Sequence, residues 1–405
     1  MNREMMPNRR DLLRSAALAP FGANLVLRGE PVCPSPCGPT GNFMLGRPTP
    51  AGTRVALERL TDWSVLKSAY AAIQPGSGMA ALADQQRIHA FYAGATPAFL
   101  SDIHEDASIF LWHRWFLYFH ERLLSWALGG NTQFALPYWD GSLDERLPLP
   151  DQMGQTPLMP PGSPCHKGQA GLATQANSVV GELQRANDIA QAYNAIKQWH
   201  SDVHILVPLV RNRPCLMQEM ETAAGDPLFY AFHAQFDRLF DWWYKLGGKK
   251  IDSQFLGQQF GFVDFPPRGQ PQCVCVTAGD ALHLVYEYDV PTPNPRPGWI
   301  RPPDGRGGQS VNTVEIDSVN LEPGVHQYQV WLACGKGRVE LGLYNLCAHH
   351  MRQSPRPGRA VYKIPEGFDC TNKKSQLELV PVGSHSRPVR LSSPKQFSLQ
   401  TMELL

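Results

Sequence analysis

The sequence lacks a long hydrophobic run, a strong net charge and any internal repeat. No apolar stretch among its 405 residues is long enough to span a bilayer, so a membrane-embedded protein is not expected. The formal net charge is +1 and only 18% of the residues are charged, which argues against a nucleic acid as partner. With 43% hydrophobic residues, the composition is that of a folded rather than a disordered chain.

The length predicts one large domain and a smaller one, because a single hydrophobic core stops growing well below this size. Residues from about 42 to 290 show mainly helical patterning. Helices are predicted over 54–74, 80–94, 109–128, 179–204 and 226–246. Asp226 and Pro227 mark the start of the last one, since they suit the N-cap and the first helical position. Residues 143–174 are rich in proline and glycine and are predicted to be a long surface loop.

The composition changes at residues 291–310, PTPNPRPGWIRPPDGRGGQS, which we interpret as a linker. Beyond it, residues 311–405 contain segments such as VHQYQVWLAC and SQLELVPV, in which apolar and polar residues alternate between turn signals. This alternation is typical of antiparallel strands. The predicted fold is therefore mainly α, a helical bundle followed by a small antiparallel β-sandwich domain.

Residues 1–32 are predicted to be a targeting signal rather than part of the folded domain. The stretch NRRDLLRSAALAPFGANLVL combines Arg9 and Arg10 with a mildly apolar segment and resembles a twin-arginine export signal. A basic, partly helical N-terminus is the alternative. Export would place the protein in the periplasm or outside the cell, where some of its nine cysteines would form disulfides. The CVC stretch, Cys273 and Cys275, is interpreted as two strand positions rather than a site for Cu(I).

Six of the 13 histidines form two sets of three along the chain. The first set is His89, His104 and His113, the last of which lies inside the apolar helix FLWHRWFLYFHERLL. The second set is His200 and His204, four residues apart and so on one helical face, together with His233.

No cysteine or carboxylate cluster accompanies these histidines. Three imidazoles per ion suit copper or zinc, whereas thiolates favour structural zinc and carboxylates favour harder ions. Paired zinc hydrolase sites usually also enlist Asp or Glu, so copper is the better prediction. The alternative, in which all six are ordinary core histidines without a metal ion, would require both sets to arise by coincidence, and we reject it.

These segments resemble the tyrosinase and polyphenol oxidase family of type 3 copper proteins, closest to the plant catechol oxidase branch. The first copper motif corresponds to His89, His104 and FLWHRWFLYFHERLL, and the second to HSDVH with DPLFYAFHAQFDRLF. LPYWDG resembles the aromatic segment that the family carries between the two motifs. YEY resembles the Tyr-x-Tyr signature that closes the catalytic domain.

That resemblance implies a dicopper catalytic domain over residues 33–290. One copper ion would be bound by His89, His104 and His113, and the other by His200, His204 and His233. The implied partners are O2 and a phenolic small molecule, with an o-diphenol oxidised to an o-quinone. The protein is expected to be a monomer or small oligomer, and its β domain is expected to shield the site.

Four further residues are placed around the coppers, and no catalytic residue is assigned beyond the ligands. Asp237, one turn after His233, is expected to accept a hydrogen bond from a ligand ring or backbone, or else to form an ion pair with Arg238 or Arg114. Ser201 and Ile205 are expected to face the substrate, and Phe229 to belong to the aromatic pocket. His120 is interpreted as a supporting or core residue.

The sequence departs from the family at two places. No carboxylate occurs in the ten residues before His200, AQAYNAIKQW, and Ser201 stands where active monophenol oxidases carry Asn, which puts monophenol hydroxylation in doubt. Ala93 and Asp102 replace the cysteine that cross-links the second ligand in relatives, so His104 should be unmodified. The alternatives are a tyrosinase with full monophenolase activity, a dedicated o-aminophenol or biosynthetic phenol oxidase, and a hemocyanin-like oxygen carrier.

Overall fold

The computed structural model describes most of the predicted helical domain and the strands of the C-terminal domain. The described residues are 41–43, 52–74, 81–93, 103–104, 106–130, 134–143, 149–159, 172–206, 216–219, 222–266, 269–293, 300–301, 309–316, 327–345, 360–365, 367–368, 370, 374–381, 387–392 and 397–404. The predicted export signal lies outside them. None of the described helices is both long enough and apolar enough to cross a membrane.

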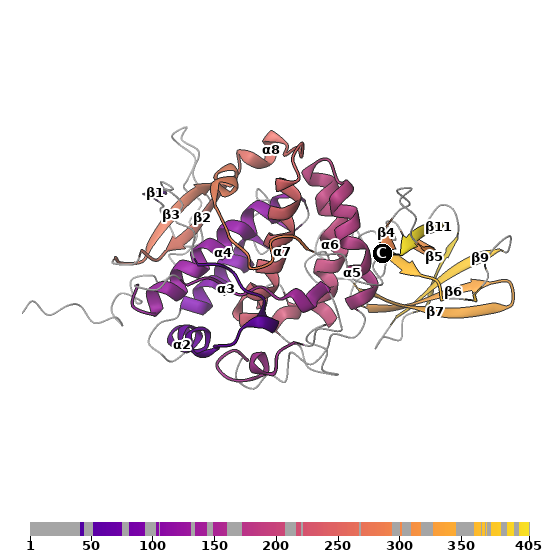
Figure 1. Cartoon of the computed structure of the whole chain (residues 1–405), viewed down its shortest axis with the longest axis horizontal. Helices are drawn as coiled ribbons and strands as arrows, with labels where there is room; N and C mark the ends of the chain where they lie inside the picture. The colour runs from indigo at the N-terminus through magenta and orange to yellow at the C-terminus, as the bar shows by residue number, and fades with distance from the viewer. Residues whose placement is uncertain are drawn as a thin grey trace, which may run out of the picture.

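The first domain is built from helices packed around one core (Figure 1). The long helices are α2 (Ser64–Ile73), α3 (Ala81–Tyr92), α4 (Ser108–Ala127), α5 (Leu172–Arg185), α6 (Ile189–Leu206) and α7 (Pro227–Lys245). Shorter elements are η1 (Leu57–Arg59), η2 (Asp140–Leu143), η3 (Asp151–Gly154), η4 (Leu216–Gln218), η5 (Ala223–Gly225), α8 (Ser253–Leu256) and η6 (Ala278–His283). The prediction of one helix over 54–74 is wrong in its first part, because α2 begins only at Ser64 and the residues before it contain only the short helix η1.

The prediction of one helix over 179–204 is also wrong, because the chain stops and restarts between α5 and α6. Asp188 accepts a hydrogen bond from the backbone N–H of Gln191, and the Gln191 side chain accepts one from the backbone N–H of Asn187. This reciprocal arrangement satisfies free N–H groups at a new helix start. The loop predicted over 143–174 also contains η3 and the first residues of α5.

Helices α4 and α7 form the centre of this domain and are buried on nearly all sides. In α7, even the polar residues Gln235, Asp237 and Arg238 are buried. Its start agrees with the prediction, since the Asp226 carboxylate accepts a hydrogen bond from the N–H of Leu228 at 2.9 Å. A helix without a solvent face needs a partner for every polar side chain it carries.

A three-stranded sheet packs against α4 at the edge of this domain (Figure 1). Its strands are β1 (Gly41–Asn42), β3 (Gln272–Thr277) and β2 (Gln259–Asp264), in that order across the sheet. Cys273 and Cys275 lie on β3, as predicted, and both are disulfide-bonded. They are therefore not thiolates that could hold a soft metal ion.

The C-terminal domain consists of two four-stranded antiparallel sheets around a core of its own. One sheet has the order β10 (Val389–Ser392), β9 (Ser375–Pro381), β6 (Gln327–Cys334) and β7 (Gly337–Asn345). The other has the order β4 (Ile300–Arg301), β11 (Phe397–Leu404), β5 (Gln309–Ile316) and β8 (Ala360–Lys363). A disulfide joins Cys334 to Cys370. The predicted fold class is confirmed, although β4 shows that part of the predicted linker joins a sheet.

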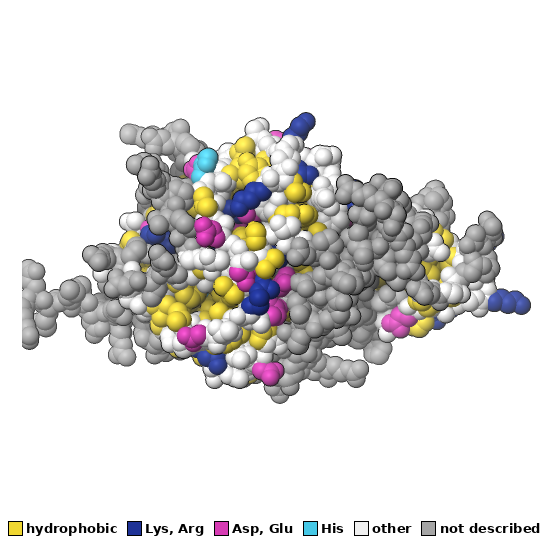
Figure 2. All heavy atoms as spheres, in the orientation of Figure 1, with side chains coloured by type: hydrophobic (Ala, Val, Ile, Leu, Met, Phe, Trp, Pro, Cys, Tyr) yellow, Lys and Arg dark blue, Asp and Glu magenta, His cyan; other side chains and the backbone are white. Residues whose placement is uncertain are grey.

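The two domains meet along α5 and α6. Strands β4 and β8 contact α5, and β7 contacts α6, so the β domain lies beside these two helices (Figure 1). On the face drawn in Figure 2, acidic and basic side chains of the described residues are interspersed. That distribution agrees with the near-zero net charge.

A buried network of charges joins α4 and α7 to the two ends of the helical domain. The Asp237 carboxylate accepts hydrogen bonds from Arg114 at 2.7 Å and from Arg54 at 2.9 Å, and Arg54 also pairs with Glu121 at 2.9 Å. The Tyr288 hydroxyl donates to Asp237 at 2.9 Å. These side chains are almost entirely buried, so removing one charge leaves its partners uncompensated.

Asp237→Asn is therefore expected to lower the free energy of unfolding by about 3–5 kcal/mol. The measurement is urea denaturation of the metal-free protein, followed by tryptophan fluorescence. Glu378→Gln is the matched control, because its ion pair with Arg338 lies on the surface of the β domain and should change stability by less than about 1 kcal/mol. Equal effects of the two substitutions would contradict the importance of the buried network.

Candidate metal centre

The six histidines converge from four helices and one turn. His89 lies on α3, His113 on α4, His200 and His204 on α6, and His233 on α7, whereas His104 lies in the turn at residues 103–104. All six are buried, none with more than 1% of its surface exposed. The structure thus brings together every residue that the sequence predicted as a ligand.

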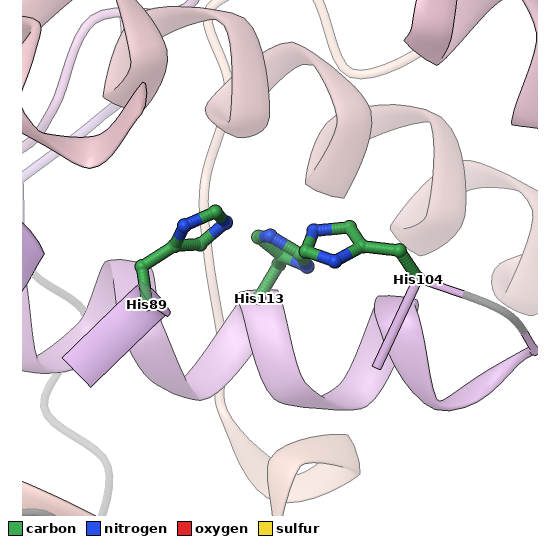
Figure 3. A group of neighbouring side chains, drawn as sticks. All are labelled: His89, His104 and His113. Carbon is green, nitrogen blue, oxygen red and sulfur yellow. The ribbon is translucent and has the colours of Figure 1, made fainter. Parts of the chain in front are cut away.

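The first triplet has the geometry of a three-histidine metal site. His89, His104 and His113 each offer one ring nitrogen, and these atoms lie within 4.8 Å of one another. The ring centroids are 5.1–5.9 Å apart. Figure 3 shows the three rings turned toward a common space, with His104 carried on a non-helical segment.

The second triplet is equally compact and lies directly beside the first. The nitrogens of His200, His204 and His233 also lie within 4.8 Å of one another, and the Nε2 atoms of His200 and His233 are 3.2 Å apart. The rings of His113 and His233 stack across the two triplets at 4.4 Å. Two ions bound here would be close neighbours, as in dinuclear sites that act on one molecule between them.

Backbone carbonyls orient three of the rings. The Nδ1 atoms of His113 and His233 each lie 2.8 Å from the carbonyl oxygen four residues earlier on their own helix, Ile109 and Phe229. An Nδ1–H donor in this position leaves Nε2 with its lone pair, and the Nε2 of His113 is buried with no hydrogen-bond partner among the described residues. Such outer hydrogen bonds fix the tautomer of a metal ligand.

The third oriented ring is that of His204, whose Nδ1 lies 2.8 Å from the carbonyl oxygen of Met217 in η4. The short helix η4 therefore supports α6 from outside the ligand segments. Sequence reasoning missed Met217, because a backbone carbonyl acts in the same way whatever side chain its residue carries.

Burial favours the neutral form of the His113, His204 and His233 rings. Desolvation lowers the pKa of His113 and of His233 well below the usual 6.5, and neighbouring histidines lower both pKa values further. Desolvation lowers the pKa of His204 to about 4, with the Met217 carbonyl and Asp226 acting in the opposite direction. A neutral ring is the form that binds a metal ion, so the donor set fits copper.

Aromatic side chains enclose the site. Phe229 is fully buried; its ring stacks on His233 at 3.9 Å and meets His89 edge-on at 4.9 Å. The Trp112 ring lies 4.8 Å from that of His113. Phe229 was expected from the sequence, and Trp112 was missed although it directly precedes a ligand. This apolar lining limits water around the imidazoles.

The expectation that Asp237 supports a ligand ring is wrong. Its carboxylate instead accepts hydrogen bonds from Arg54, Arg114 and Tyr288, as the alternative ion-pair interpretation with Arg114 foresaw. The rings use backbone carbonyls in its place. Arg238 pairs with Asp140 rather than with Asp237.

The two residues predicted to face the substrate are only partly described. Ser201 is buried, and its hydroxyl donates to the carbonyl of Lys197 at 3.1 Å, one turn earlier on α6. The backbone of Ile205 lies in α6, but its side chain is outside the described part of the structure.

His120 is a core residue rather than a ligand. Its ring is fully buried and stacks on Tyr230 at 3.3 Å, and its Nε2 lies 3.0 Å from the Tyr70 hydroxyl. Its Nδ1 has no hydrogen-bond partner among the described residues. Desolvation lowers its pKa well below 6.5.

The chain matches the family described as the common central domain of tyrosinase, over residues 79–188 and 166–246. These ranges include all six histidines of the candidate centre. The match therefore covers the part of the chain that forms the site.

Curated relatives with similar sequences come from plants. The chain is 27% identical over 364 residues to the latent form of a chloroplastic polyphenol oxidase of Prunus armeniaca, covering 76% of this chain and 59% of that protein. It is 27% identical over 262 residues to catechol oxidase B of Solanum tuberosum, covering 54% of this chain and 43% of that one. The chain thus spans less than two thirds of the length of these relatives.

Solved structures share the two-domain fold. A recombinantly expressed latent aurone synthase, a polyphenol oxidase, aligns with a TM-score of 0.59 at 17% identity, over 90% of this chain and 92% of that one. A latent apple tyrosinase aligns with a TM-score of 0.52 at 17% identity, over 89% of this chain and 99% of that one.

Copper binding is the first prediction from this geometry. The purified protein is expected to bind two copper ions per chain, and His204→Ala is expected to bind one after dialysis against a weak chelator. The reason is that two imidazoles remain in the second triplet, whereas the first keeps all three. Metal content measured by atomic spectroscopy checks this, with His120→Gln as the control that should retain two ions. A loss of both ions from His204→Ala would contradict two separable binding sites.

The second prediction concerns acid stability and His120. Because its folded-state pKa lies below 6.5, the unfolded chain takes up a proton at this ring as the pH falls below 6.5 while the folded chain does not. The stability present above pH 6.5 is therefore lost toward lower pH, by up to about 1 kcal/mol per pH unit for this ring.

In the metal-free protein, His120→Gln should reduce the fall in unfolding free energy between pH 6.5 and pH 5 by about that amount per pH unit. Urea titrations at several pH values measure the slope. Val65→Thr, at an exposed position on α2, is the control and should leave the slope as in the wild type, because it removes no titratable group. An unchanged slope in His120→Gln would refute the assignment.

Proposed function

Starting from the tyrosinase central domain within residues 79–246, we propose that this protein is a dicopper phenol oxidase that converts o-diphenols to o-quinones with O2. The observation that carries the proposal is the pair of adjacent, buried, all-imidazole triplets. The plant relatives named polyphenol oxidase and catechol oxidase support it.

Copper is favoured over zinc by the donor set. Neither triplet includes a carboxylate or a thiolate, and no acidic residue bridges them among the described groups. When bound, the copper pair would supply the electron transfer between a diphenol and O2, which redox-inert zinc does not offer. His89, His104 and His113 would hold one ion and His200, His204 and His233 the other.

The protein's own residues would position the reactants and keep water away. Helices α4 and α7 fix the contact between His113 and His233, and the carbonyls of Ile109 and Phe229 hold these rings in the ligating tautomer. The rings of Phe229 and Trp112 line the back of the site, where they limit solvent. A low-dielectric surrounding strengthens the electrostatic interactions made there.

The side chains of α6 support oxidation of o-diphenols over hydroxylation of monophenols. Two glutamines, Gln191 and Gln198, precede His200 on this helix. The Gln191 side chain caps the start of the helix, far along it from His200. The Gln198 amide donates to Asp202 at 3.1 Å. Asp202 is buried, but it lies two residues from both His200 and His204, which places it on the opposite face of the helix.

The comparisons support one of the alternative activities more than the others. One relative is named a (+)-larreatricin hydroxylase, at 25% identity, so relatives with similar sequences include a named hydroxylase as well as a catechol oxidase. A tyrosinase with full monophenolase activity is therefore the second candidate. No described feature specifically favours an o-aminophenol oxidase or a hemocyanin-like carrier.

We further propose that the β domain keeps the enzyme latent. Strand β7 contacts α6, the helix that carries two of the proposed ligands, and three of the proteins named above are described as latent. We also propose export by the twin-arginine route and a monomeric or small oligomeric state. The proposed domain limits are 1–32 for the export signal, 33–290 for the catalytic domain, 291–310 for the linker and 311–405 for the β domain.

Oxygen uptake by the copper-loaded protein tests the proposed activity. We expect rapid uptake with a catechol and at least about 100-fold slower uptake with the matched monophenol, because general-base assistance typically contributes 10²–10⁴-fold. The protein is compared intact and after cleavage in the 302–308 segment, where release of latency should raise the rate.

The controls separate the parts of the proposal. His204→Ala should abolish uptake with either substrate, whereas Glu378→Gln on the β-domain surface should retain it. Similar rates for catechol and monophenol would make the protein a tyrosinase. Absence of uptake by the cleaved protein, with two coppers bound, would refute phenol oxidation.

A further inference from the structure

His104 is the one predicted ligand that does not itself lie on a described helix. The other five lie on α3, α4, α6 and α7, where backbone hydrogen bonds fix their positions. His104 lies in a turn, where the backbone N–H of Ile103 donates a hydrogen bond to the Tyr92 carbonyl at 3.3 Å. Figure 3 shows its ring reaching the site from this non-helical segment.

No covalent cross-link from the preceding segment can restrain this ring. Position 93, at the end of the first ligand segment, is a buried alanine, and position 102 is an aspartate. Neither carries sulfur, so His104 depends on non-covalent contacts. Its ring packs against those of His89, His113 and His200 at 5.1–5.8 Å.

A tyrosine on α6 holds the backbone of His104 directly. The Tyr193 hydroxyl donates a hydrogen bond to the His104 carbonyl oxygen at 2.6 Å, across 89 residues of sequence, and the interaction is buried. Tyr193 lies seven residues before His200, which is two helical turns, so the two side chains project from the same face. One face of α6 thus carries Tyr193, His200 and His204.

We propose that Tyr193 is a positioning residue that ties the first ligand set to the helix bearing the second. Through the His104 carbonyl it fixes the turn relative to α6, and so sets the position of one triplet against the other. Lys197, one turn later, lies 5.5 Å from the Tyr193 ring centroid and helps to hold the phenol in this orientation. The proposal rests on the proposed function only in taking the two triplets as copper sites.

Tyr193→Phe removes a single oxygen atom and tests the proposal. Tyr70→Phe is the matched control, because it also removes a buried hydroxyl that meets a histidine, but that histidine, His120, is not a predicted ligand. Both copper-loaded proteins are challenged with a chelator, and the copper remaining is followed with time together with the Cu(II) EPR signal.

In Tyr193→Phe, one copper per chain should be lost about 10-fold or more faster than in the wild type, since loss of a ligand's supporting hydrogen bond typically weakens metal binding by 10–100-fold. The EPR signal of an isolated Cu(II) should appear at the same time, because the remaining ion has lost its magnetically coupled neighbour. Tyr70→Phe should keep the wild-type rate. Equal release from the two variants, or simultaneous loss of both ions, would overturn the proposal.

A second readout needs no copper. Hydrogen–deuterium exchange of the metal-free proteins should be faster in the peptide containing Ile103 and His104 in Tyr193→Phe, and unchanged there in Tyr70→Phe. If exchange at this peptide is the same in both variants, Tyr193 does not hold the turn. If the wild type fails to bind two coppers while the exchange difference appears, the proposed function fails and the positioning role of Tyr193 stands.

Discussion

The ion pair between Arg114 of α4 and Asp237 of α7 is the interaction on which the rest of the site depends. Arg114 directly follows His113, and Asp237 lies one turn after His233. The same two helices bring these histidine rings into contact at 4.4 Å, one from each triplet. This buried ion pair holds α4 against α7. It therefore also fixes the spacing of the two histidine triplets.

The pair is stable in the core because it is part of a larger network. Arg54 supplies a second positive charge to Asp237 and is itself paired with Glu121, and Tyr288 donates a further hydrogen bond. The guanidinium of Arg54 also lies over the Tyr286 ring at 3.6 Å. Residues from both ends of the helical domain thus converge behind the histidines, so that the start and end of this domain are needed to hold its centre.

The ligands and fold class could be predicted from sequence because they rest on local patterns. Histidines four residues apart in WHSDVH must share a helical face, and alternating strands after residue 310 must expose one face and bury the other. The features that could not be predicted from the sequence depend on contacts made by side chains. Asp237 looks like ligand support one turn from His233, but Arg54, 183 residues away, competes for its carboxylate. The break before α6 depends on reciprocal caps around Asp188, which a hydrophobic pattern does not reveal.

Helix α6 links the candidate metal centre to the β domain. One of its faces carries His200 and His204 and, two turns earlier, the Tyr193 hydroxyl that holds the turn of His104. The helix also contacts β7 of the C-terminal domain. A displacement of α6 by the β domain would therefore act directly on three of the six histidines, whereas the other three lie on α3, α4 and α7. Any influence of the β domain on the site should for this reason be felt first at His200, His204 and His104.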